Sequence, residues 1–236
     1  MVRKQTVSSP DRQLLAKAQK VYQALSGEFG LPDWKRPLSA LDELVSTILS
    51  QNTNDVNRDV AFNRLKEKFP DWEAVRDAPV EEVIEAVRPA GLANQKAPRM
   101  QAILRQISAE RGCLDLEFLG SLERDQAHVW LSRFKGVGPK TAAIVLQFAL
   151  GIPAFPVDTH VYRVSGRLGL RPEKMNVEET HTWLESVFAP DQYGPGHMNL
   201  IRLGREICHA RKPECERCPL NGLCDYYQNL QKPGLN

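Results

Sequence analysis

Four of the five cysteines of this 236-residue chain lie within seventeen residues of one another. Cys208, Cys215, Cys218 and Cys224 follow the spacing C-x6-C-x2-C-x5-C, and the fifth, Cys113, lies far upstream. Clustered thiolates select zinc or iron–sulfur clusters. Zinc sites usually pair their ligands at C-x2-4-C, whereas here wide, uneven gaps bracket one tight pair. The spacing therefore favours a [4Fe–4S] cluster held by four cysteines, with a structural zinc ion as the alternative.

The composition indicates an ordinary globular protein, 42% hydrophobic and 25% charged. The first thirteen residues lack the apolar stretch of a signal peptide. No segment is apolar over a length that could span a membrane. Disulfide bonds would require an oxidising compartment. We therefore expect a cytoplasmic protein with reduced cysteines and no membrane contact.

The net charge of +2 does not by itself indicate a nucleic-acid partner, but the charges are segregated. Residues 1–36 carry seven Lys or Arg against three acids, including Arg3, Lys4, Lys35 and Arg36. Residues 71–85 carry six acids against Arg76 alone. One surface facing a polyanion would produce this pattern, and so would plain solvated helix faces.

Apolar residues recur at helical spacing along most of the chain, as over residues 41–49, 80–87 and 100–107. Pro89 ends the second stripe. Asn176 followed by Glu179 predicts an N-cap with its reciprocal acid. No strand-like alternation bounded by hairpin turns occurs. The chain is predicted to be all-α, with two helical domains that meet at the Pro/Gly-rich break over 151–156 and a cleft between them.

The segment over residues 131–146 predicts a helix, a tight turn and a second helix. Gly136 and Gly138 permit positive φ and close approach by another backbone, and Pro139 suits the first helical position. Exposed amides before the second helix could hold a phosphate oxygen. A plain helix–helix connection would look the same.

Two residues near this turn could do chemistry. Lys140 follows Pro139 in the first helical turn, where the helix dipole and partial burial would favour a neutral amine able to form a Schiff base. Asp158 lies eighteen residues on, between apolar residues and a predicted helix start. It could cap that helix, act in catalysis, or do both. For a lone lysine the simpler interpretation is a solvated or phosphate-binding side chain.

Three motifs together resemble the endonuclease III family of helix–hairpin–helix DNA glycosylases. They are Gly-Val-Gly-Pro-Lys-Thr-Ala at 136–142, Val-Asp-Thr-His-Val at 157–161 and the cysteine cluster. The likeness runs from about Leu31 to Cys224. It implies a six-helix barrel domain over 33–152 with the hairpin, and a cluster domain formed by 1–32 and 153–236. It also implies a nucleoid-associated monomer whose partner is double-stranded DNA with damaged bases or abasic sites.

The resemblance implies a bifunctional DNA glycosylase and AP lyase. Such an enzyme would excise oxidised pyrimidines and cleave the abasic site by β-elimination, with Lys140 as Schiff-base nucleophile and Asp158 as the essential aspartate. The four cysteines would hold a [4Fe–4S] cluster that shapes a DNA-binding loop over 209–214. The implied DNA contacts are the hairpin amides of Gly136, Val137 and Gly138, the wedge residue Leu92, and the side chains of His160, Arg211 and Lys212.

The chain departs from the family pattern at two places. Phe134-Lys135 replaces the usual Leu-Pro before the hairpin, which adds Lys135 as a possible phosphate contact. The family's gap-filling Gln falls on Asn52 in Ser50-Gln51-Asn52, so either Asn52 or Gln51 could fill the space left by an extruded base.

Three alternatives remain at this stage: a DNA-binding module without chemistry, a zinc protein of unrelated function, and a relative acting on adenine mismatches. Lys140 together with Asp158 argues against the first, and the ligand spacing argues against the second. Mismatch relatives usually lack the lysine and carry a further C-terminal domain, whereas twelve residues follow Cys224 here.

Overall fold

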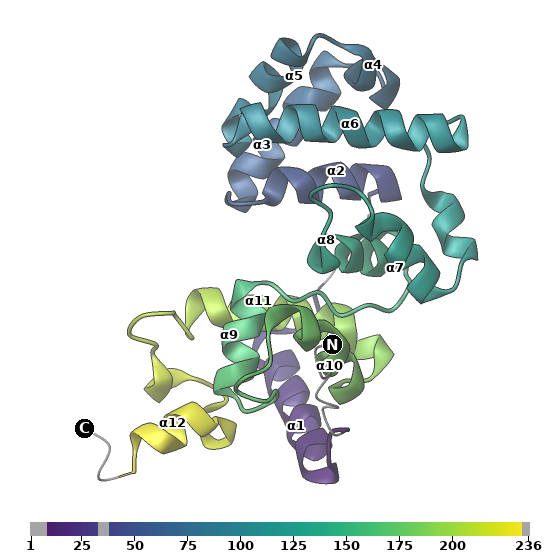
Figure 1. Cartoon of the computed structure of the whole chain (residues 1–236). Helices are drawn as coiled ribbons and strands as arrows, with labels where there is room; N and C mark the ends of the chain where they lie inside the picture. The colour runs from purple at the N-terminus through teal and green to yellow at the C-terminus, as the bar shows by residue number, and fades with distance from the viewer. Residues whose placement is uncertain (1–8, 33–37, 233–236) are drawn as a thin grey trace. The chain divides into compact units, whose positions relative to one another are not determined.

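The computed structural model describes residues 9–32 and 38–232, and these residues form helices, turns and loops without a strand (Figure 1). The all-α prediction is therefore confirmed over the described ranges. The expected domain boundary at residue 33 and the basic residues Arg3, Lys4, Lys35 and Arg36 lie outside them. None of the described helices is both long and apolar enough to cross a membrane.

The contacts between residues divide the chain into two compact units. One unit is Lys35–Ile152, and the other combines Met1–Trp34 with Pro153–Asn236. The first unit contains α2 (Ala40–Ser50), α3 (Asp55–Lys68), α4 (Trp72–Asp77), α5 (Val80–Val87), α6 (Ala93–Arg111), α7 (Arg124–Ser132) and α8 (Pro139–Ile144). Short 3-10 turns, η1 (Arg88–Ala90) and η2 (Glu117–Ser121), flank α6.

The longest helix of the Lys35–Ile152 unit, α6, packs against α4 and α5, while α2 contacts α3, α6 and α8. The three predicted apolar stripes fall on α2, α5 and α6, and their residues form the core: Leu44, Ile48, Val83, Val87, Met100 and Leu104 are at most 1% exposed. The third helix begins earlier than its stripe, at Ala93, and contains Pro98 in its second turn. Pro98 is the sixth residue of the helix, so it removes one intrahelical hydrogen bond, the one that an amide there would donate to the carbonyl of Asn94.

A π-helical turn, η3 (Val145–Ala149), continues directly from α8. The amide of Leu150 donates to the carbonyl of Val145 at 3.2 Å, five residues back. The second predicted helix of the helix–turn–helix segment is present, but the widened turn at its end was not predicted. Such turns occur often at functional sites.

The second unit contains α1 (Arg12–Phe29), α9 (Thr159–Arg167), α10 (Val177–Val187), α11 (Tyr193–Glu206) and α12 (Asp225–Leu230), with short turns η4 (Pro190–Gln192), η5 (Cys215–Arg217) and η6 (Asn221–Leu223). Helix α11 packs against α1 and α9. The N-terminal and C-terminal segments share this unit, since Lys17 on α1 pairs with Asp225 on α12. Asn176 and Glu179 form the predicted capping box at the start of α10.

Candidate functional site

The hairpin between α7 and α8 depends on a glycine at its tip. Gly136 has a φ of +91°, and a Cβ there would lie 2.5 Å from the Cδ of Arg99. Any larger residue would meet both backbone strain and this side chain. Pro139 occupies the first position of α8, as predicted.

The three hairpin amides are not equivalent. The amide of Val137 donates to the carbonyl of Phe134 at 3.0 Å, and the Val137 side chain is buried. The turn therefore already uses the amide of Val137, and contact of this residue with a phosphate stays a prediction. The amides of Gly136 and Gly138 make no hydrogen bond with another described residue, so they remain as the donors that could meet an anion.

Lys140 is the second residue of α8 and is half-buried. Helix α8 is held by contacts with α2 and α7, and its residues Thr141, Ala142 and Ala143 are buried. A lysine so placed has its helix fixed by packing while its amine retains access to solvent. Lys140 follows Gly138, whose amide is free, by two residues in the chain.

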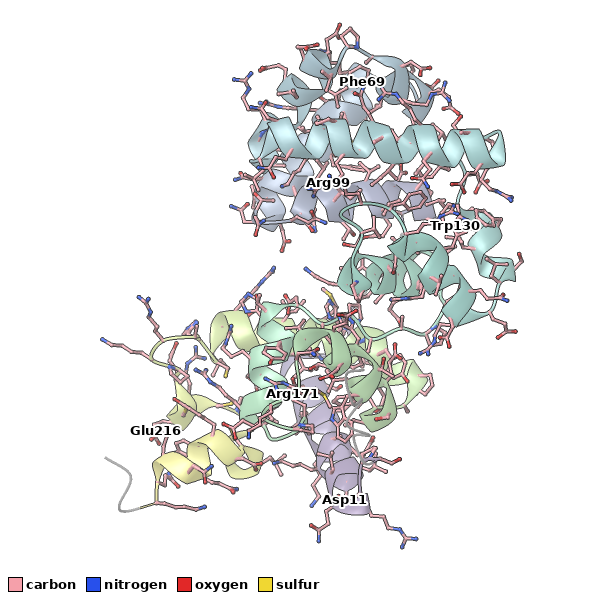
Figure 2. The ribbon with its side chains drawn as sticks, in the orientation of Figure 1. Asp11, Phe69, Arg99, Trp130, Arg171 and Glu216 are labelled. Carbon is pink, nitrogen blue, oxygen red and sulfur yellow. The ribbon has the colours of Figure 1, made fainter. Side chains whose placement is uncertain are left out.

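The side chain of Gln51, at the end of α2, is bonded at both ends. Its Nε2 donates to the carbonyl of Gly136 at 2.9 Å, and its Oε1 accepts from Nη1 of Arg99 at 3.3 Å. Figure 2 marks Arg99 between α6 and α2. The side-chain amide of Gln51 is thus engaged with the hairpin and with Arg99. Sequence reasoning did not identify Arg99, because only the folded unit brings it to the hairpin.

Three non-glycine residues of the described chain have positive φ: Asn52 at 53°, Leu92 at 50° and Lys212 at 50°. Each is one of the DNA contacts expected from the sequence. Leu92 is also 48% exposed. Residues held in this region of backbone space cost free energy and cluster at functional sites.

Asp158 caps α9 in the second unit. Its Oδ1 accepts a hydrogen bond from the amide of Val161 at 2.7 Å, and the side chain is half-buried. The predicted capping role is confirmed, and it leaves the other carboxylate oxygen without a bond in the described chain. His160, in the first turn of the same helix, places Nδ1 3.1 Å from Nη2 of Arg163.

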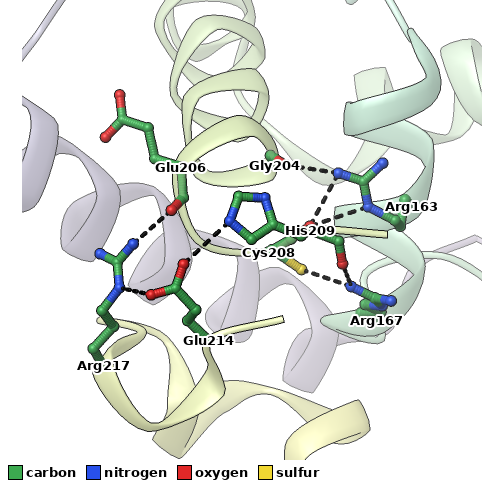
Figure 3. A network of polar contacts seen from close by, with 8 residues as sticks. All are labelled: Arg163, Arg167, Gly204, Glu206, Cys208, His209, Glu214 and Arg217. Carbon is green, nitrogen blue, oxygen red and sulfur yellow. Dashed lines mark hydrogen bonds and ion pairs between the residues drawn. The ribbon is translucent and has the colours of Figure 1, made fainter. Parts of the chain in front are cut away.

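Two arginines of α9 bind the segment that begins at the first clustered cysteine (Figure 3). Arg163 donates to the carbonyls of Gly204 at 2.8 Å and Cys208 at 3.0 Å. Arg167 donates to the carbonyl of His209 at 2.6 Å and lies 3.3 Å from Sγ of Cys208. The helix that Asp158 caps is thereby tied to the cysteine segment. The sequence shows these arginines one turn apart but does not reveal their partners.

The four cysteines line one cavity together with apolar residues of α9 and α11, among them Val164, Leu203 and Ile207. Burial raises the pKa of the Cys215, Cys218 and Cys224 thiols, and neighbouring thiolates raise it further. Thiols that line one cavity lose their protons together when they bind a positively charged metal centre. The donor set and the apolar cavity therefore fit a group of iron and sulfide, with Arg167 beside one sulfur.

The loop between the first two cysteines is closed at its base by an ionic contact (Figure 3). Glu214 accepts from Nε of Arg217 at 2.6 Å and lies 3.2 Å from Nε2 of His209. Hydrogen bonds from these two side chains hold the pKa of Glu214 below its usual range. Arg211 and Lys212 are exposed between these anchors, as is Lys135 at the hairpin.

Comparison with known proteins identifies the family. The model of the HhH-GPD superfamily of base excision DNA repair proteins matches residues 45–190, and that of the iron–sulfur binding domain of endonuclease III matches residues 208–224. The chain belongs to the endonuclease III family. The second match begins at Cys208 and ends at Cys224, which favours an iron–sulfur cluster over the zinc alternative.

Endonuclease III proteins from two bacteria resemble the chain over most of its length. The Thermotoga maritima protein is 35% identical over 80% of this chain and 84% of its own. The Bacillus subtilis protein is 34% identical over 81% and 84%. Among solved structures, a non-covalent endonuclease III–DNA complex matches with a TM-score of 0.78 at 28% identity, covering 92% of this chain and 97% of that one.

A trapped covalent endonuclease III–DNA intermediate matches with a TM-score of 0.79 at 27% identity, covering 92% of this chain and 99% of that one. As an endonuclease III homologue, the chain is a DNA glycosylase and AP lyase of base excision repair, and it carries a [4Fe–4S] cluster. The resemblance stated from the three motifs is confirmed.

Proposed function

We propose that this endonuclease III homologue excises oxidised or ring-saturated pyrimidines from double-stranded DNA, with Lys140 as its nucleophile. The observation that carries the proposal is the position of Lys140. It is half-buried in the first turn of α8 and follows the free amides of Gly136 and Gly138 within four residues of the chain. A phosphate bound to those amides would bring the adjoining sugar near the amine.

Lys140 would act as a neutral amine that attacks C1′ of the damaged nucleotide. The new bond from Nζ to C1′ replaces the glycosidic bond, and the base leaves with the bonding electron pair. The sugar ring then opens: the C1′–O4′ bond breaks, O4′ takes up a proton, and C1′ forms the protonated imine with Nζ. This imine acidifies the C2′ hydrogen. Loss of that proton and departure of the 3′ phosphate nick the strand, and water releases the amine from the product.

Asp158 would act by its charge. The sugar becomes positive as the base departs, and a fixed carboxylate stabilises that charge without reorganisation. The hydrogen bond from the Val161 amide holds one oxygen in place and leaves the other for the substrate. Capping and catalysis are therefore compatible in the same side chain.

Leu92 and Asn52 would open the duplex. Leu92 offers an exposed apolar wedge, and Asn52 offers a short amide to the space left by the base. A base inside a duplex must be extruded before chemistry, at a cost of a few kcal/mol that is lowest for damaged bases. A saturated pyrimidine is non-planar and stacks poorly, so we propose thymine glycol as a representative substrate.

The remaining contacts would hold the phosphate backbone and the cluster. We assign phosphate contacts to Lys135, Arg211 and Lys212, a further contact to His160, and the cluster ligands to Cys208, Cys215, Cys218 and Cys224. When bound, the cluster joins four points of the loop and so fixes Arg211 and Lys212. We propose that a single copy acts on each lesion, at the nucleoid.

Borohydride trapping on a panel of lesion duplexes tests the proposal. Wild-type protein should form a trapped complex with thymine glycol DNA, whereas Lys140→Gln should form none and still bind the duplex. Lys174→Gln is the control, since it removes an exposed lysine that is assigned no DNA contact, and it should trap normally. Undiminished trapping by Lys140→Gln would identify another amine. Processing of adenine opposite an oxidised guanine, with thymine glycol ignored, would overturn the substrate assignment.

A further inference from the structure

Lys96, on α6, is 2% exposed, and among the described residues it is the one Lys, Arg, Asp or Glu that is buried. Its Nζ donates to the carbonyl oxygen of Leu49 at 2.7 Å and to that of Ala90 at 2.8 Å. Lysine is almost never buried so fully unless its amine has partners. Neither the proposed chemistry nor the proposed DNA contacts use this residue.

The two carbonyls belong to the segments that lead to Asn52 and Leu92. Leu49 lies in the last turn of α2, three residues before Asn52, and Ala90 ends η1, two residues before Leu92. The backbone amide of Lys96 also donates to the carbonyl of Leu92 at 2.9 Å. Lys96 therefore bonds both segments of this unit that lead to a non-glycine residue with positive φ, Asn52 in one and Leu92 in the other.

We infer that Lys96 is a positioning residue that fixes the spacing between Leu92 and Asn52, the two groups proposed to open the duplex. The inference rests on the proposed function of those two residues. Movement of either segment alone would break a buried hydrogen bond and leave a buried amine or carbonyl without a partner, which is costly. The wedge and the gap-filling amide are thereby preorganised before DNA binds.

The chemistry of the amine supports a role beyond packing. Burial lowers the pKa of Lys96 to about 8, so the fold retains the amine against a desolvation penalty. An apolar side chain would fill the same space without that penalty, but it could not bond two carbonyls. The amine is therefore the part of the side chain that the two segments require.

Lys96→Met tests the inference, because methionine fills similar space without donors. Gln101→Met is the matched control. Gln101 lies on the same helix, is 1% exposed, and donates from Nε2 to the carbonyls of Val75 at 2.8 Å and Ala78 at 2.9 Å. Both variants lose two hydrogen bonds from a buried side chain to backbone carbonyls, but only Lys96→Met releases the segments before Asn52 and Leu92.

Three measurements separate positioning from general destabilisation: base extrusion followed with 2-aminopurine, single-turnover excision of thymine glycol, and nicking of a preformed abasic site. Lys96→Met should lose extrusion amplitude and slow excision by about tenfold or more, with a smaller loss in nicking. Gln101→Met should show no such split. In a Leu92→Ala background Lys96→Met should slow excision less than it does in the wild-type protein, because Lys96 is inferred to act through the position of Leu92.

Equal losses in the Lys96 and Gln101 variants, or wild-type extrusion by Lys96→Met, would overturn the inference. If Lys96→Met does not fold, Lys96→Gln is compared with Gln101→Met in the same way and with the same expected split. If the wild-type protein itself fails to excise thymine glycol, the proposed substrate is overturned and not the role of Lys96. The two failures are therefore distinguishable.

Discussion

The side-chain amide of Gln51 donates to the carbonyl oxygen of Gly136 at 2.9 Å, across 85 residues of sequence. This bond joins the end of α2 to the tip of the hairpin, and Arg99 supports it from α6. The orientation of the free hairpin amides therefore depends on a residue that does not itself belong to the hairpin.

Gln51→Leu should weaken binding to all duplexes, damaged or not, by about 1 kcal/mol, or about fivefold in Kd, because the hairpin loses its anchor. Fluorescence anisotropy with labelled duplexes measures this. Gln106→Leu is the control, since Gln106 pairs only with Glu110 one turn along α6. Unchanged affinity for Gln51→Leu would show that the hairpin holds its shape alone.

Asp158 has two separable roles, and two substitutions divide them. Asp158→Asn retains a strong N-cap but removes the charge, so it should melt like wild type and lose base excision by orders of magnitude. Asp158→Ala should lose excision and also about 1 kcal/mol of unfolding free energy. Thermal melts and single-turnover excision measure the two effects. Near-normal excision by Asp158→Asn would show that Asp158 acts only as the N-cap of α9.

The cluster prediction concerns composition and folding. Purified protein should contain about four iron and four sulfide per chain, with little zinc. Cys215→Ser should give poorly folded protein, since the segment around the cysteines has little core of its own. Cys113→Ser should match wild type, because Cys113 is exposed and outside the cluster. One zinc per chain by elemental analysis would contradict the assignment.

Phosphate contacts should dominate affinity. Replacing Lys135, Arg211 or Lys212 with Ala should flatten the slope of log K against log salt by about 1 and weaken all sequences alike. Lys66→Ala is the control, because the Lys66 amine is paired with Asp42 and lies over the Trp72 ring. Unchanged slopes for all three variants would place the basic contacts elsewhere.

Two glycines should respond in opposite directions to alanine. A Cβ on Gly204 in α11 would lie 2.9 Å from the Cβ of His160 on α9, so Gly204→Ala should destabilise by about 1–3 kcal/mol. A Cβ on Gly27 in α1 meets nothing within 4 Å, so Gly27→Ala should stabilise by about 0.5–1 kcal/mol. Urea unfolding measures both. Equal stability of the two variants would mean that α9 and α11 can separate without cost.

Local features were predictable from the sequence because they depend on residues a few positions apart. Pro139 begins α8, Asp158 caps α9, Asn176 and Glu179 form a capping box, and α5 ends before Pro89. Each is decided by backbone sterics or by one side chain bonding a nearby amide. The cysteine spacing and the three ordered motifs likewise indicated the family without coordinates.

Tertiary structure alone decided which distant groups meet. Lys96 on the carbonyls of Leu49 and Ala90, and Arg163 on that of Cys208, are buried or half-buried bonds between segments that only packing brings together. A sequence shows which donors and acceptors a chain possesses. The fold determines which of them are already paired, because most buried polar groups find their partners within it.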